Sequence, residues 1–232
     1  MAKRPVFVPN MNGFPFVEVI EIEFEWFSGF AKSQAQKSIA SQHSVAQALG
    51  ITPVLEISSK SVDPLGVSLS AFNLILNVPN QLEMSVECAF QGSKVFENGG
   101  PYTDLYSVSS RDAKTDPRIR NSGDVIAFRF LGEDFPVTPK TAFYDWLYIS
   151  ALWQNPVLST SLTDYNAFSD IAFNPEHSLN CQARSAAIYV SLLRNADVER
   201  VVNDQNYYLD LMTCKQGKDL AGDQPGQMTM FG

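Results

Sequence analysis

The stretch at residues 85–100 most constrains how this chain can fold. It carries the end signals of a helix, because Ser85 can cap the N-terminus and two glycines before Pro101 can stop it. Apolar residues cover most of its circumference, which is typical of a buried helix. The polar strip that is left must face a ligand or form an internal network, since buried polar groups need partners. At about 100° per residue, that strip holds four side chains: Glu87, Gln91, Lys94 and Asn98.

Composition indicates a soluble protein with a sizeable core. The chain has 232 residues, 45% of them hydrophobic and 12% aromatic, which argues against disorder. No apolar run approaches the roughly 18 residues of a membrane helix, and the N-terminal residues lack the apolar centre of a secretion signal. Three widely spaced cysteines (Cys88, Cys181 and Cys214) are an odd number. We therefore expect free thiols in the cytoplasm.

Metal and triad chemistry are poorly supported by the sequence. The chain has only two histidines, His43 and His177, and no Cys/His/Asp spacing resembles a metal site. We expect no metal and no cofactor. The net charge of -8 argues against nucleic-acid binding through the overall field, although it does not exclude a local basic patch. Residues 111–120 hold four basic side chains, and a run of this kind usually forms a solvated helix end or loop.

Patterning divides the chain into three parts. An N-terminal extension at residues 1–53 is expected to pack a strand and a helix on the core. In it, residues 5–16 resemble an extended arm, residues 16–26 alternate like a strand with one wet face, and residues 32–49 predict a helix with His43 on its surface. A catalytic core is expected at residues 54–214. Residues 215–232 are polar and Gly-rich, which predicts a loose tail.

Within the core, the elements are expected to alternate between strands and helices. Strands are predicted at residues 54–57 and 124–131, and a short helix capped by Ser109 or Ser110 is predicted to stop at Pro117. Longer helices are predicted at residues 140–154, with Thr138 and Pro139 as the start, and at 178–194. Residues 66–77 fit a strand or a helix equally well. The loop at residues 58–61, with Lys60, can bind phosphate or form an ordinary turn.

Several of these motifs together resemble the NADAR family. The helix at 85–100 is similar to the family's E-x-x-x-Q-x-x-K pattern, and Ser110-Arg111-Asp112-Ala113-Lys114 is similar to its stretch ending in Ala-Lys. Trp146 fits its tryptophan-bearing helix, and Asp170 fits its aspartate after a loop. Two further stretches look like reordered or reduced family motifs: Leu69-Ser70-Ala71-Phe72-Asn73 and Leu179-Asn180-Cys181-Gln182. The resemblance spans residues 54–195.

The resemblance implies a fold and a function. The fold implied is α+β, a mostly helical single domain around a small sheet. The chain looks most like the antitoxin branch that accompanies DarT-type DNA ADP-ribosyltransferase toxins. That branch implies a glycohydrolase that removes ADP-ribose from guanine bases in DNA. The expected partners are ADP-ribosylated DNA or ADP-ribose, and the cognate toxin.

The chemistry of the polar strip suggests roles for its members. Cleavage of the bond between ribose and guanine develops positive charge at the anomeric carbon, which Glu87 can stabilise directly or by activating water. Lys94 can form a Schiff base with the opened sugar, and Gln91 can hold ribose hydroxyls. Asp170 can bind a hydroxyl or orient Lys94. Trp146 can stack on a base or pack in the core.

Three further residues complete the expected substrate site, and several rival functions stay open. Lys60, Asn73 and Arg111 are expected to bind substrate. The main rival is a module that binds ADP-ribose or a related nucleotide without cleaving it, or an N-glycosidase acting on a small nucleotide metabolite. Another is a hydrolase with Cys88 as nucleophile, although that residue fits packing better. The last is an antitoxin that blocks its toxin by contact alone.

Overall fold

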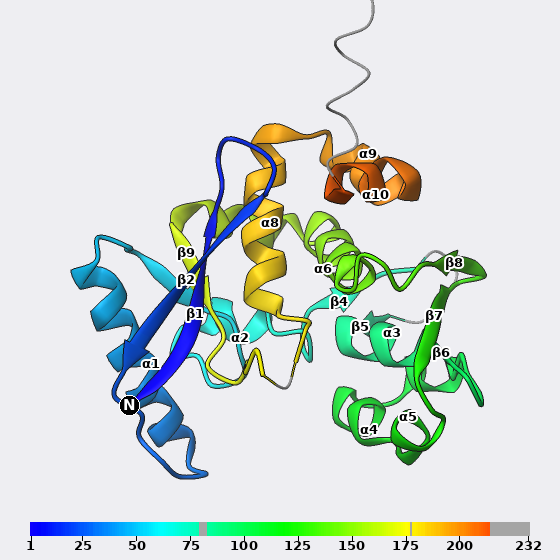
Figure 1. The fold of residues 1–232 in the computed structure, drawn as a ribbon, viewed down its shortest axis with the longest axis horizontal. Helices are drawn as coiled ribbons and strands as arrows, with labels where there is room; N and C mark the ends of the chain where they lie inside the picture. Colours follow the sequence, from blue (N-terminus) through cyan, green and yellow to red (C-terminus); the bar gives the residue numbers. More distant parts are fainter. Residues whose placement is uncertain (79–82, 177, 214–232) are drawn as a thin grey trace, which may run out of the picture.

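A four-stranded mixed sheet forms one half of the protein (Figure 1). The computed structural model describes residues 1–78, 83–176 and 178–213. The sheet order is β2 (Val17–Phe24), β1 (Ala2–Pro9), β9 (Ala167–Ser169) and β3 (Val54–Glu56). β1 is antiparallel to both β2 and β9, whereas β3 and β9 are parallel. Together with the helices, this confirms the α+β class and a single compact domain.

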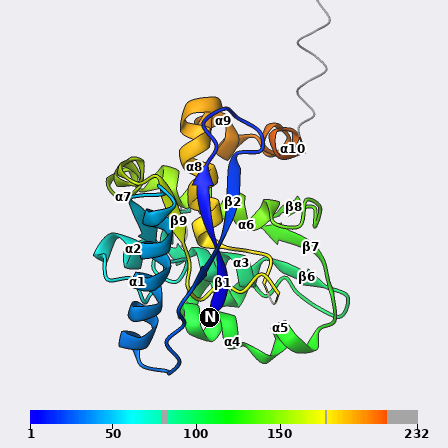
Figure 2. The same ribbon diagram turned by 60° about the vertical axis from the view of Figure 1, so that its left-hand side comes forward.

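Strand alternation sends successive side chains to two covered faces of this sheet. Val6 and Ala167 point to one face, where they join a cluster with residues of α1 (Lys32–Ala48). Phe7 and Phe168 point to the other face and join the main core with α8 (Gln182–Asn195). Figure 1 shows α1 and α8 on opposite sides of the β1–β2 hairpin, and Figure 2 shows the same arrangement from the side.

The N-terminal segment is more ordered than its prolines suggest. The prediction of an extended arm at residues 5–16 is wrong, because β1 pairs with β2 along its whole length and also with β9. The predicted strand is confirmed as β2, in which Glu21 and Glu23 are exposed and Ile22 and Phe24 are buried. The division into extension and core stays a prediction, and the expected tail at 215–232 lies outside the described residues.

The other half of the fold combines short strands with short helices. β6 (Lys94–Phe96), β7 (Val125–Phe130) and β8 (Glu133–Phe135) form an antiparallel sheet, and β7 confirms the predicted strand at 124–131. The stretch at 66–77 is split between the end of a helix and a strand. The remaining elements of this half are α2 (Pro64–Ser68), β4 (Ile75–Leu76), β5 (Met84–Ser85), η1 (Thr103–Ser107), α4 (Ser110–Thr115) and α5 (Pro117–Asn121).

The C-terminal half is helical, as predicted, with different boundaries. α6 (Ala142–Gln154) starts after Thr141 rather than at Thr138 and Pro139. Pro117 and Pro156 each begin a helix instead of only ending one, since the fixed φ of proline suits the first helical position. The last elements are α7 (Pro156–Ser159), η2 (Thr160–Asp164), α9 (Val198–Asn203) and α10 (Gln205–Thr213). No helix in the described ranges is long and apolar enough to cross a membrane.

The buried helix α3 (Val86–Gly92) is shorter than predicted. Ser85 is its N-cap, as expected, and accepts a hydrogen bond from the Cys88 amide at 3.1 Å. The helix ends at Gly92 instead of Gly99, and Lys94 already belongs to β6. The predicted helical strip through Lys94 and Asn98 is therefore wrong. After Ser93 the chain pairs with β7 as β6, and the ring of Tyr106 in η1 lies against Gly92 where any side chain would stand.

His43 is also placed differently from the prediction. Instead of lying free on the surface of α1, it is half-buried, with Nε2 2.8 Å from the Ser169 hydroxyl. Ser169 in turn donates to the buried Glu56 carboxylate at 2.6 Å, and the Ile171 amide donates to the same carboxylate at 2.9 Å. Burial lowers the pKa of His43 to about 4. The sequence offered no sign that β9 would bring Ser169 beneath α1.

We expect Gly92→Ala to destabilise the fold by about 1–3 kcal/mol, the usual cost of overpacking. A Cβ at this position would lie 2.5 Å from the Tyr106 ring. Urea unfolding measures the effect. The same substitution made together with Tyr106→Ala should cost less, because the ring is then absent. Equal costs in the two backgrounds would show that the close approach is unimportant.

We expect the protein to lose stability in acid because acid protonates the half-buried His43. Its folded pKa of about 4 lies below its unfolded value of 6.5, so its contribution is complete above pH 6.5 and is lost as the pH falls through about 4. At about 1.4 kcal/mol per pKa unit, the loss is at most about 3 kcal/mol. Urea unfolding at pH 7.5 and 4.5 should show a larger loss for the wild type than for His43→Gln. Equal losses of unfolding free energy in the wild type and in His43→Gln would contradict this prediction.

Candidate functional site

A cavity of about 530 Å³ lies beside α3. Its walls come from segments that are distant in sequence: the loop after β3, the turn at residues 70–72, α3, α4, α6 and the segment from β9 to α8. The volume of the cavity falls in the usual range of ligand sites, and it is large enough for part of a nucleotide. This cavity is therefore the candidate functional site.

A chain of polar side chains runs along α3 beside this cavity. Gln91 Nε2 donates to Glu87 Oε1 at 2.9 Å, and Lys94 Nζ donates to Gln91 Oε1 at 2.7 Å. Glu87 and Gln91 are one helical turn apart, which places them on the same side of α3. From α4, Lys114 Nζ lies 3.7 Å from Glu87 Oε1. The Glu87 carboxylate is thus buried between an amide and a cation while still lining the cavity.

The two lysines differ in their surroundings. Burial lowers the pKa of Lys94 to about 8, with Glu87 opposing the shift and Lys114 adding to it. The Lys94 ammonium also lies 4.5 Å from the centre of the Phe90 ring. Lys114 is more exposed, with 56% of its side chain accessible. A substantial neutral fraction near physiological pH is therefore a property of Lys94.

Asp170 forms part of another wall of the cavity. It directly follows β9, and its Oδ1 accepts a hydrogen bond from the Ala172 amide at 3.0 Å. Burial raises the pKa of Asp170, and the negative charge of Glu56 adds to the rise. Glu56 itself is held by Ser58 and Ser169, each donating at 2.6 Å. Glu56 therefore connects the loop that carries Ser58 to the strand that precedes Asp170.

Aromatic side chains supply much of the remaining lining. Phe72, Phe90, Tyr144 and Phe173 all line the cavity. Tyr144 is buried edge-on to Phe90, with ring centres 5.1 Å apart, and burial together with the Glu87 charge raises its pKa well above the ordinary value. Flat apolar rings next to charged groups suit a ligand that has bases as well as phosphates or sugars.

Two buried polar atoms in the lining lack partners within the described residues. They are Ser70 Oγ and Asn180 Oδ1. An unsatisfied buried polar atom costs free energy. A hydroxyl-rich ligand in the cavity would supply the missing hydrogen bonds, because Asn180 Oδ1 can accept and Ser70 Oγ can do either.

Some of the predicted site residues meet here and others do not. Glu87, Gln91 and Asp170 line the cavity, whereas Lys94 is outside the lining and is hydrogen-bonded to the lining residue Gln91. The other four predicted residues are not part of the lining: Lys60, Asn73, Arg111 and Trp146. Lys60 follows two lining serines, Ser58 and Ser59, so the loop is at the cavity although this lysine is not.

Trp146, Asn73 and Cys88 have structural contacts that explain their positions. The Trp146 indole donates to the Val201 carbonyl at 3.2 Å and packs on Phe135 with ring centres 4.8 Å apart. The Asn73 amide donates to the Val67 carbonyl at 2.8 Å. The Cys88 thiol is buried and donates to the Val108 carbonyl at 3.3 Å, as expected of a packing residue.

Sequence reasoning missed Tyr144, Lys114 and Phe72 as site residues. Lys114 and Phe72 lie in motifs that carry the family resemblance, and Phe72 stands beside the Asn73 that was chosen. Tyr144 is two residues before Trp146 on α6, so the sequence located the aromatic helix, of which Tyr144 lines the cavity and Trp146 does not. Among the described residues, no group of three or more His, Cys, Asp or Glu side chains could hold a metal ion.

The arrangement is suited to acting on a sugar–base bond. The Glu87 carboxylate and several aromatic rings line one cavity, and the Lys94 amine, which has a lowered pKa, is hydrogen-bonded to the lining residue Gln91. None of the curated proteins matches the chain. A family profile described as "DarT1-associated NADAR antitoxin" matches residues 2–221. Because this match covers nearly the whole sequence, the chain belongs to the family of DarT1-associated NADAR antitoxins.

Proposed function

We propose that this antitoxin is an ADP-ribosyl glycohydrolase that removes ADP-ribose from guanine bases in DNA. The observation that carries the proposal is the Glu87 carboxylate, which lines the cavity while connected to Gln91 and Lys94. Breaking the bond between the ribose anomeric carbon and the guanine amine develops positive charge on that carbon. A buried carboxylate beside it stabilises that charge more than an exposed one would.

A Schiff base with Lys94 is the covalent route that we propose. The neutral amine of Lys94 attacks the anomeric carbon while the bond to guanine breaks, and the proton that Lys94 loses passes through Glu87 to the departing guanine amine. The sugar ring then opens as its bond to the anomeric carbon breaks, the remaining lysine N–H proton passes to the ring oxygen, and the adduct becomes a Schiff base. Water then adds to the lysine–sugar adduct and releases ADP-ribose and free lysine. The lowered pKa of Lys94 supports this role, since only the neutral amine is a nucleophile. Direct attack by water that Glu87 activates is the alternative.

Recognition of the substrate is assigned to the remaining lining. Phe72 and Phe173 are proposed to stack on a base. Ser70 and Asn180, with their unpartnered oxygens, are proposed to bind hydroxyls of the sugar. Asp170 is proposed to donate a hydrogen bond in its protonated form, which its raised pKa favours. The reaction would repair DNA in the cytoplasm after the paired toxin has acted.

We expect Glu87→Gln to lower the rate of ADP-ribose release from ADP-ribosylated DNA by about 10²–10³-fold, the usual cost of losing a charge-stabilising group. The amide keeps the shape but removes the negative charge. The matched control is Glu83→Gln, which changes an exposed carboxylate three residues before the start of α3. It should retain full activity. Equal activity of Glu87→Gln and wild type would reject Glu87 as the catalytic carboxylate, and binding without release by the wild type would favour a binding module or a blocking antitoxin.

The pH profile and trapping experiments test Lys94. With a pKa of about 8, its neutral fraction grows from about one tenth at pH 7 to about nine tenths at pH 9. We expect turnover of the wild type to rise over this range. Borohydride should trap a sugar adduct that mass spectrometry maps to residue 94.

Lys94→Ala should lose both turnover and adduct, whereas Lys140→Ala, which changes an exposed lysine outside the cavity lining, should keep them. An adduct mapped to Lys114 would transfer the covalent step to that residue. Full turnover without any adduct would instead support direct water attack.

A further inference from the structure

The segment formed by α4 and α5 is a basic element on an acidic protein. Residues 110–121 carry four basic and two acidic side chains, a net charge of +2, whereas the whole chain carries -8. The rest of the chain therefore carries -10. Positive charge so concentrated on one short segment needs a structural or functional explanation, because salt weakens isolated surface charges.

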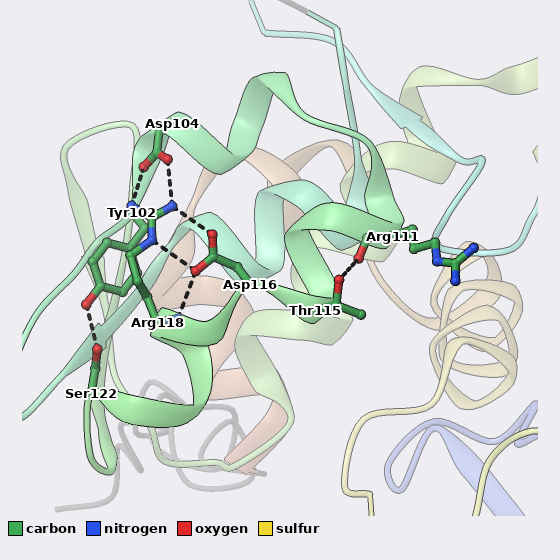
Figure 3. Close-up of polar contacts among 7 residues, drawn as sticks. All are labelled: Tyr102, Asp104, Arg111, Thr115, Asp116, Arg118 and Ser122. Atoms are coloured by element: carbon green, nitrogen blue, oxygen red, sulfur yellow. Dashed lines mark hydrogen bonds and ion pairs between the residues drawn. The ribbon is translucent and has the colours of Figure 1, made fainter.

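One of the four basic residues has a structural role. Arg118 donates to both Asp104 and Asp116, at 2.6 and 2.9 Å for its closest pairs, and its guanidinium lies 4.5 Å from the centre of the Tyr102 ring. Tyr102 in turn bonds Ser122 at 2.6 Å. Figure 3 shows these groups gathered at one end of the segment. Arg118 is thereby neutralised and connects α5 to η1.

Two of the other three basic residues, Arg111 and Arg120, keep their charges available, whereas Lys114 pairs with Glu87. Within the described residues, Arg111 and Arg120 form no ion pair, and both are exposed. Figure 3 shows the Arg111 side chain directed away from the Arg118 cluster, with no contact from its guanidinium to the other residues drawn. Lys114 lies one turn after Arg111 on α4 and lines the cavity beside Glu87. Along α4, basic side chains therefore extend from the cavity at Lys114 to the exposed Arg111.

We propose that α4 and α5 bind the phosphates of the DNA strand next to the modified guanine, with Arg111 and Arg120 as the contacts outside the cavity. This inference rests on the proposed function. A cavity of about 530 Å³ can take the modified base and its ADP-ribose in part but not the strand, so the flanking phosphates must lie at the rim. The acidic remainder of the protein repels DNA, which leaves this basic segment as the favourable contact.

Kinetics on two substrates of different size test the proposal. The probes are a single-stranded oligodeoxynucleotide with one ADP-ribosylated guanine, and ADP-ribosylated guanosine. For Arg111→Gln/Arg120→Gln, we expect the KM for the oligonucleotide to rise about tenfold and kcat to stay constant. The slope of log KM against log salt should become shallower by about 1.4, because each phosphate contact on a single strand contributes about 0.7. The nucleoside, which has no flanking phosphates, should be cleaved as by the wild type.

Arg118→Gln is the matched control on the same segment. Its charge is already neutralised by two carboxylates, so it should leave the salt slope unchanged and lower the melting temperature instead. An unchanged slope in the double variant, or an equal rise in KM for oligonucleotide and nucleoside, would overturn the proposal.

The proposed function can fail separately, since the wild type would then release ADP-ribose from neither substrate. In that case, fluorescence anisotropy with the unmodified oligodeoxynucleotide still measures the surface: weaker binding and a shallower salt slope in the double variant would support it, and equal binding would refute it. Tighter binding of an RNA of the same sequence at equal salt would refute the assignment to DNA.

Discussion

The burial of α3 is the constraint on which the rest of the site depends. All seven of its residues are buried, including Glu87 and Gln91. A carboxylate in that position needs partners, since an isolated buried charge costs several kcal/mol. Gln91 and Lys114 supply them from α3 and α4, and Lys94 completes the chain from β6. The fold therefore fixes the carboxylate in a water-poor wall, where its charge acts strongly on whatever enters the cavity.

The same burial separates the two lysines into different chemical states. Lys94 arises from the strand that follows α3 and stays beneath Phe90 and Gln91, away from solvent. Lys114 comes from an exposed helix and keeps contact with water. The lowered pKa of Lys94 favours its neutral, nucleophilic amine, whereas Lys114 pairs with the Glu87 carboxylate.

Local sequence signals predicted which helices and strands are present better than they predicted the residues at which these begin and end. Alternation located β2, the Ser85 cap located the start of α3, and the end signals of α1 held because its neighbours do not override them. The failures have a tertiary origin. α3 ends where the chain enters β6, which pairs with the distant strand β7, and β9 is a three-residue strand held between β1 and β3. Neither contact leaves a local pattern.

The candidate site shows the same difference between local signals, which can be recognised in the sequence, and tertiary contacts, which cannot. Glu87, Gln91 and Asp170 line the cavity, as predicted, because helical spacing identifies the first two and the order of the motifs that resemble the family identifies Asp170. Trp146 does not, since the choice between Trp146 and Tyr144 depends on how α6 is rotated against α3 and α9. The net charge of the chain likewise does not describe the charges at the cavity. A sum of -8 describes the average field, whereas a substrate meets the few charges at the cavity. Only the fold shows that Arg118 is neutralised by carboxylates while Lys114 is at the site, so the sign of the local field follows from pairing and not from composition.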